Sequence, residues 1–145
     1  MHKNLFFSLS LISCISIYSA DGKYTTDTVR TPLTLETYLA EITRAGFTGK
    51  KPEDIMNKHA LRFAIAYPAL TKSIQTACTI SDNTVRNKQL YDVYKQAAHA
   101  GWPIEIDLYF ATQIPKKVNS SFREYQARVN HEALLRIQKD GDKEN

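Results

Sequence analysis

The sequence predicts an all-α protein, a single-domain bundle of five or six helices after an N-terminal signal peptide. Two observations predict this fold class. Apolar residues after residue 31 recur at intervals of three and four, which is the period of a helix with one buried side. Proline, glycine and small polar residues interrupt that pattern where helices would begin and end. The roughly 125 residues that follow the signal are enough for one modest core.

The first twenty residues have the three parts of a secretory signal. His2 and Lys3 give a basic start, an apolar run covers residues 5–17, and the small residue Ala20 ends the segment. We therefore expect residues 1–20 to be a signal peptide and the protein to be periplasmic or secreted. The piece LISC resembles a bacterial lipobox, so a lipid anchor at Cys14 is the alternative. No later stretch reaches the roughly 20 apolar residues that a membrane span needs.

Residues 21–31 have no apolar period and are expected to form a flexible arm before a helical domain over residues 32–139. Thr34 is suited to cap the start of the first helix, and Gly46 is suited to end it in a left-handed turn. The apolar residues of this helix at helical spacing are Leu35, Leu39 and Ile42, with Tyr38 beside them.

Two prolines divide the following segment into two helices. Pro52 fits a first helical position, and Pro68 ends that helix and begins the next, because the residue before a proline avoids the α conformation. The expected inward residues are Ile55, His59, Phe63 and Ala66 in one helix and Leu70, Ile74, Ala77 and Cys78 in the other.

A cap cluster at residues 81–83 precedes a helix that runs to about residue 100, and Gly101 ends it. Its expected inward residues are Val85, Leu90, Val93 and Ala97. The next segment has two interpretations. IEIDLYF alternates like a half-buried strand, but a lone strand needs a partner and the segment follows Pro103, so residues 103–112 form either a strand or a short helix.

The last helix has the clearest periodicity of the chain. Ser121 and Glu124 match a capping box, which predicts a helix start near residue 121. Its apolar residues are Phe122, Tyr125, Val129, Ala133 and Ile137, with Leu134 beside them. Residues 140–145 are polar, and we expect them to form a disordered tail.

No group of residues in the sequence predicts catalysis or a bound cofactor. A metal site needs several converging ligands, and no two of His59, His99 and His131 are one helical turn apart. Cys78 lies on the apolar side of its helix, where a thiol behaves as a small hydrophobe with a raised pKa. The five glycines are scattered singly, so no phosphate-binding loop is predicted. We expect no catalytic residue, no metal and no cofactor.

The expected partner is another protein. The chain has 19 Lys and Arg against 15 Asp and Glu, and the signal removes only one lysine, so the charge is too weak to predict nucleic-acid binding. Tyrosine and tryptophan are enriched at interfaces, and basic doublets can contact an acidic partner. The candidate partner-binding residues are Tyr91, Tyr94, Trp102, Lys116 and Lys117. Pairing of two copies as a homodimer is also open.

Four short pieces within residues 33–79 match a known pattern. They are Thr34–Leu39, Lys51–Asp54, Pro68–Leu70 and Ala77–Thr79. Together they resemble the HdeA/HdeB family of periplasmic acid-stress chaperones, which implies a helical fold that holds unfolded clients. The family's disulfide would join position 35 to Cys78, but this chain has Leu35 there. We therefore expect Leu35 and Cys78 to face each other as an apolar contact in the place of the bridge.

Three functions are consistent with these observations. The first is an exported helical protein without catalytic activity that neutralises or escorts another protein, as an immunity protein does with a toxin or an inhibitor with an enzyme. The second is an acid-stress chaperone of the HdeA/HdeB type, whose partners are unfolded clients. The third is a secreted effector or enzyme whose site residues are dispersed along the chain. The lack of a recognisable catalytic set favours the first.

Overall fold

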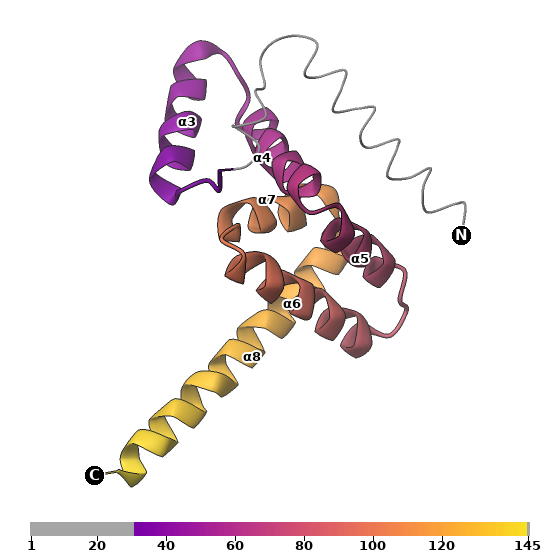
Figure 1. Cartoon of the computed structure of the whole chain (residues 1–145), viewed down its shortest axis with the longest axis vertical. Coiled ribbons are helices and arrows are strands. Elements are labelled where there is room, and N and C mark those ends of the chain that lie inside the picture. The colour runs from indigo at the N-terminus through magenta and orange to yellow at the C-terminus, as the bar shows by residue number, and fades with distance from the viewer. Residues whose placement is uncertain (1–30, 145) are drawn as a thin grey trace.

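A computed structural model describes residues 31–144 and shows six helices and no strand in that range (Figure 1). The helices are α3 (Leu35–Thr48), α4 (Pro52–Ala66), α5 (Pro68–Cys78), α6 (Asn83–His99), α7 (Pro103–Gln113) and α8 (Lys116–Lys143). The prediction of an all-α fold is confirmed. The expected signal peptide, Cys14 and residues 21–30 of the arm lie outside the described residues.

Five of the helices share one core, and α3 lies outside it. The centre of the core consists of large apolar side chains that solvent does not reach, one or two from each of α4 to α8. They are Phe63, Ile74, Leu90, Ile106, Phe110 and Phe122. In Figure 1, α3 stands apart from this group and reaches it through α4. The fold is therefore a five-helix core with one attached helix.

The segment that could have been strand or helix is the central helix of this core. α7 begins with Pro103 at its first position and packs most extensively on α4, with further contacts to α6 and α8. Its buried residues are Glu105, Ile106, Leu108, Tyr109 and Phe110. Because other helices surround α7, both the apolar positions of the alternating pattern and the positions between them, such as Glu105 and Tyr109, are buried. The strand interpretation is therefore wrong.

Several predicted helix ends are confirmed, and one is wrong. The Thr34 side chain caps α3 by accepting a hydrogen bond from the Thr37 N–H, and Asp82 caps α6 in the same way. The predicted stop at Gly46 is wrong, because α3 continues for two more residues and Gly49 takes the left-handed conformation with φ 77°. A glycine in this conformation ends a helix without the steric cost that a Cβ brings.

The last helix is longer than the sequence predicts at both ends. α8 begins at Lys116 after Pro115, so the predicted capping box at Ser121 and Glu124 is wrong. The backbone before Ser121 is already helical, and its side chain contacts α6 instead. α8 also continues to Lys143, so residues 140–143 are helical where a disordered tail was expected.

Candidate partner-binding surfaces

The three predicted aromatic residues belong to the core or its edge. Trp102 is buried, which is the opposite of the surface position expected for it. Tyr94 is half-buried between Phe110 and Phe122, with centroid distances of 5.8 Å to both rings. Its hydroxyl donates to Asp107 Oδ1 at 2.9 Å. Burial is the main cause that raises the pKa of Tyr94, and the nearby Asp107 carboxylate raises it further. These contacts explain the two rings by packing.

The third aromatic residue and the basic doublet lie nearer to solvent. Tyr91 stacks edge-on against Tyr125 at 6.0 Å, which joins α6 to α8. Lys116 and Lys117 are exposed in the first turn of α8. Positive charge at a helix N-terminus opposes the helix dipole, so this doublet does not stabilise the helix that carries it. The structure does not bring the doublet together with the predicted aromatic residues.

Leu35 and Cys78 do not form the buried contact expected of them. Leu35 is 62% exposed at the first position of α3, and α3 packs mainly on α4. Cys78 is half-buried at the end of α5 against the core. Burial raises the pKa of the Cys78 thiol more than nearby Arg86 lowers it, so the thiol is protonated at neutral pH.

The side of α3 that faces α4 is held by a polar contact that the sequence did not reveal. Fully buried His59 shares a hydrogen bond of 2.5 Å between its Nε2 and Glu41 Oε2, and its Nδ1 lies 3.3 Å from Arg62 Nη1. These partners fit the neutral tautomer with the proton on Nε2. Burial lowers the pKa of His59 despite the opposing effect of Glu41. Burial alone would raise the pKa of Glu41, but the His59 contact and nearby Lys58 and Arg44 lower it.

A second buried carboxyl anchors the chain before α3. Glu105 is fully buried in α7, and its Oε1 accepts a hydrogen bond of 2.6 Å from the Leu33 N–H. Arg62 donates to the Thr31 carbonyl at 2.5 Å, so the chain is fixed at both residues. Burial raises the pKa of Glu105. If residues 103–112 are taken as a helix, Glu105 lies on the same side as Leu108 and Tyr109, which predicts that Glu105 is buried. The alternating pattern instead placed Glu105 on the polar side.

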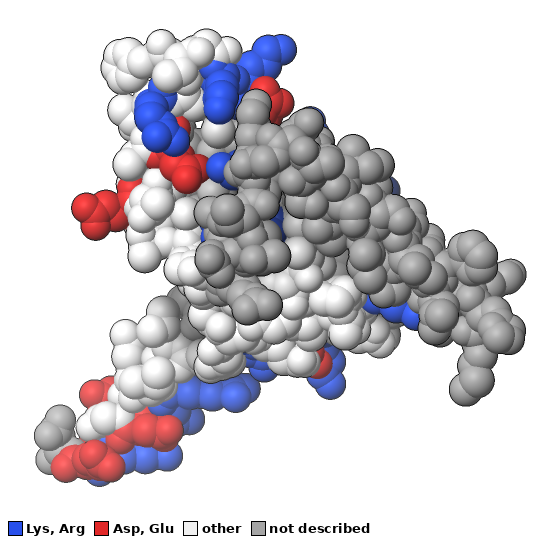
Figure 2. All heavy atoms as spheres, turned by 45° about the horizontal axis from the view of Figure 1, so that its top comes forward, with Lys and Arg blue, Asp and Glu red and all other residues white. Residues whose placement is uncertain are grey.

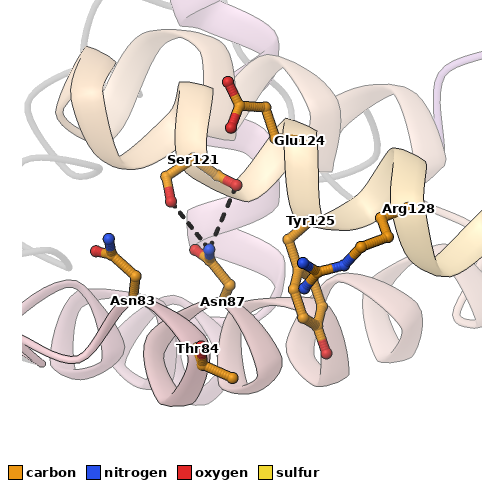
Figure 3. Close-up of a pocket in the computed structure, with 7 residues that line it drawn as sticks. All are labelled: Asn83, Thr84, Asn87, Ser121, Glu124, Tyr125 and Arg128. Atoms are coloured by element: carbon orange, nitrogen blue, oxygen red, sulfur yellow. Dashed lines mark hydrogen bonds between the residues drawn. The ribbon is translucent and has the colours of Figure 1, made fainter.

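A polar groove of about 350 Å³ lies between α6 and α8 (Figure 3). Its lining residues are Asn83, Thr84, Asn87, Ser121, Glu124, Tyr125 and Arg128. The Asn87 side chain donates to Ser121 Oγ at 3.0 Å and to the Ser121 carbonyl at 3.3 Å. Arg86 also donates to Ser121 Oγ, at 3.4 Å. The hydroxyl thus receives donors and has no histidine base beside it, so the groove joins two helices and lacks the arrangement of a nucleophilic site.

α3, the helix outside the core, has large apolar side chains that solvent reaches: Leu35, Leu39 and Phe47 are exposed and Ile42 is half-buried. The α3 surface consists of Leu35, Leu39, Ile42 and Phe47, of which Leu39 is 53% and Phe47 88% exposed. Leu35, Leu39 and Ile42 lie on one stripe of α3. Another side of the same helix contacts α4 through Tyr38, Glu41 and Ala45. Figure 2 shows uncharged side chains gathered at this end of the molecule.

The C-terminal part of α8 forms a second exposed feature. Figure 1 shows this part of the helix running away from the other helices to the C-terminus. Every residue from 130 to 143 is exposed, including Leu134, Leu135 and Ile137. We call residues 127–143 the α8 arm. Since short helices are marginal in water without packing, an exposed arm with apolar residues indicates a contact surface.

Residues 31–144 contain no group of three or more His, Cys, Asp or Glu side chains placed to hold a metal ion. None of the helices described is both long enough and apolar enough to cross a membrane. Comparison of the chain with protein-family models, curated proteins and solved structures found no match.

Proposed function

We propose that this chain is an exported protein without catalytic activity that binds another protein, as an inhibitor or immunity protein does. The α3 surface is the observation that carries the proposal. Large apolar side chains project from a helix whose other side is anchored to α4 by Tyr38, Glu41 and Ala45. An anchored helix with an open apolar stripe matches the groove-binding helices by which proteins recognise one another.

The charges around the α3 surface indicate the kind of partner. Arg44 on α3 and Lys50 and Lys51 shortly after it are exposed, as is Glu36 on the same helix. Interfaces commonly combine an apolar centre with a charged rim whose sign is complementary to the partner. The partner therefore carries an apolar groove with an acidic rim.

Affinity capture from extracts of the source organism at neutral pH, followed by calorimetric titration of the captured protein, tests the proposal. Leu39→Asp places a charge in the centre of the α3 surface and should weaken binding by at least about tenfold, because central apolar residues dominate interface energies. Val85→Asp is the matched control, since Val85 is an exposed aliphatic residue on α6. Recovery of no stoichiometric partner, or equal losses from the two variants, would reject the proposal.

The alternative is an acid-stress chaperone of the HdeA/HdeB type, and one observation favours it. The polar contact that attaches α3 joins Glu41 and His59, and both groups gain a proton in acid. Below about pH 3, where carboxylates are mostly neutral, α3 would lose this contact and uncover the apolar side of α4. A chaperone should bind ANS and prevent client aggregation there. A chain that stays compact and ANS-silent in acid is not a chaperone.

A further inference from the structure

The apolar residues of the α8 arm continue the side of α8 that is buried in the core. Phe122 is fully buried, Val129 is half-buried, and Ala133 and Ile137 follow at helical spacing beyond the last contact with α6. Leu134 lies beside Ile137 on the same side, one turn away. The exposed fractions of the two side chains are 59% and 68%, so this stripe is uncovered in a single copy.

A line of charged residues with alternating sign borders this stripe. Glu132, Arg136, Asp140 and Lys143 follow one another at intervals of four, four and three, with Lys139 beside them, and Lys143 Nζ lies 3.9 Å from Asp140 Oδ1 in the same copy. The arm as a whole has four basic and three acidic residues, and both signs gather at this end of the molecule in Figure 2. A partner that attracts one sign alone, such as a nucleic acid or an anionic lipid surface, does not fit such an edge.

The alternating line is complementary to itself when reversed. In an antiparallel pair of helices, like edges face each other, so the charged edge of one copy meets the charged edge of the second. A two-fold axis near residue 138 brings Arg136 opposite Asp140 of the second copy and Glu132 opposite Lys143 of the second copy. Symmetry forms each pair twice. A parallel pair would instead set this edge against the opposite edge, which carries His131 and Gln138.

The same arrangement accounts for a glycine inside the arm. Gly141 lies in the last turn of α8, two residues before the helix ends at Lys143, and a Cβ built there would meet nothing within 4 Å. In the antiparallel register, Leu134 of the second copy lies opposite Gly141, and the missing side chain leaves room for it.

We infer that the α8 arm is a self-association site, in which the arms of two copies of this chain pair antiparallel through Leu134, Ile137 and the alternating charged edge. The pairing goes beyond the proposed function, because it uses a surface at the other end of the molecule and leaves the α3 surface open. Few side chains are buried in it, so the association is weak and depends on protein concentration.

Sedimentation velocity on the full chain, from micromolar to millimolar concentrations, tests this inference. We expect a monomer–dimer equilibrium in the unmodified protein and a monomer at every concentration for Ile137→Asp. Leu135→Asp is the matched control: Leu135 is also exposed, at 51% against 68% for Ile137, but lies on the opposite side of the arm, so the dimer should remain.

A charge exchange tests the antiparallel register. Arg136→Glu should weaken the dimer by about tenfold, because it makes two attractive pairs repulsive. The double variant Arg136→Glu with Asp140→Arg should restore it, and added salt should reduce both effects. Circular dichroism checks that the arm stays helical in every variant. A monomeric unmodified protein, equal effects of the two Asp substitutions, or no recovery in the double variant would each overturn the inference without affecting the α3 surface.

Discussion

Phe122 is the one fully buried residue of α8 among the residues described, so replacing it tests how the helix is held. Its ring lies 4.6 Å from Phe110 and 5.8 Å from Tyr94, measured between centroids. We expect Phe122→Ala to lower the free energy of unfolding by about 3–5 kcal/mol, the usual cost of a cavity of this size. Since domains of this size are stable by only about 5–15 kcal/mol, the loss is a large fraction of the total.

Urea denaturation measures this loss with two signals. The chain has a single tryptophan, Trp102, whose fluorescence reports on the core, and circular dichroism at 222 nm reports on all helices. Both transitions should move together to lower urea for Phe122→Ala. Leu135→Ala is the control, with an expected change below about 0.5 kcal/mol because its side chain is exposed and lies outside the proposed pairing surface. If Phe122→Ala costs less than about 1 kcal/mol, or if the fluorescence transition stays in place, the packing of α8 on the core is not what stabilises it.

Three further predictions concern protons and glycines. The pKa values of Glu41 and His59 are lowered in the folded state, so the unfolded chain takes up protons first. Their contribution to stability should therefore fall as pH drops below the ordinary pKa values of 6.5 for histidine and then 4.5 for glutamate. Glu41→Gln should flatten the acidic part of that profile, measured by urea titrations between pH 4 and 8. Glu105 has a raised pKa, so its favourable contribution lies at low pH and is lost as pH rises; Glu105→Gln should therefore gain more stability at pH 7 than at pH 4. Gly49→Ala should cost about 1 kcal/mol because φ is positive there, whereas Gly46→Ala should gain about 0.5–1 kcal/mol within the helix. Melting temperatures of the glycine pair that shift in the same direction would contradict the backbone argument.

Local signals predicted most helix starts because they depend on residues a few positions apart. Thr34 and Asp82 cap their helices as expected, and Pro52 and Pro68 begin theirs. Each of these residues acts through its own backbone or a neighbour within four positions. Such interactions need no knowledge of the tertiary fold, so a single sequence contains them.

The side of a helix that becomes buried depends on its neighbours, and there the sequence was less informative. The stripe of Leu35 and Leu39 predicts burial of that side of α3. The helix instead packs on α4 through Tyr38 and Glu41, which both contact His59. Val85 was expected inside and is exposed, whereas the next residues Arg86 and Asn87 are buried, so another side of α6 faces its neighbours. A stripe shows that a surface is apolar but not what covers it.

The candidate surfaces show the same division between local and distant information. The α8 arm could be read as an amphipathic helix, but its separation from the core depends on where α6 and α7 end. The buried roles of Glu105 and Asn87 depend on Leu33 and Ser121, which are 72 and 34 residues away in the chain. No periodicity within one segment can predict a partner at that distance.

The single buried anchor of α8 gives this helix the mechanics of a lever. Phe122 is its fixed point, and the helix extends about 32 Å from there to Lys143 at 1.5 Å per residue. A tilt of about 10° at Phe122 would move the far end by about 6 Å while the fixed point stays in place. In a pair of chains joined through their arms, small tilts at Phe122 would therefore change the distance between the two helical domains. Each domain could turn toward its own target while the arms stay paired.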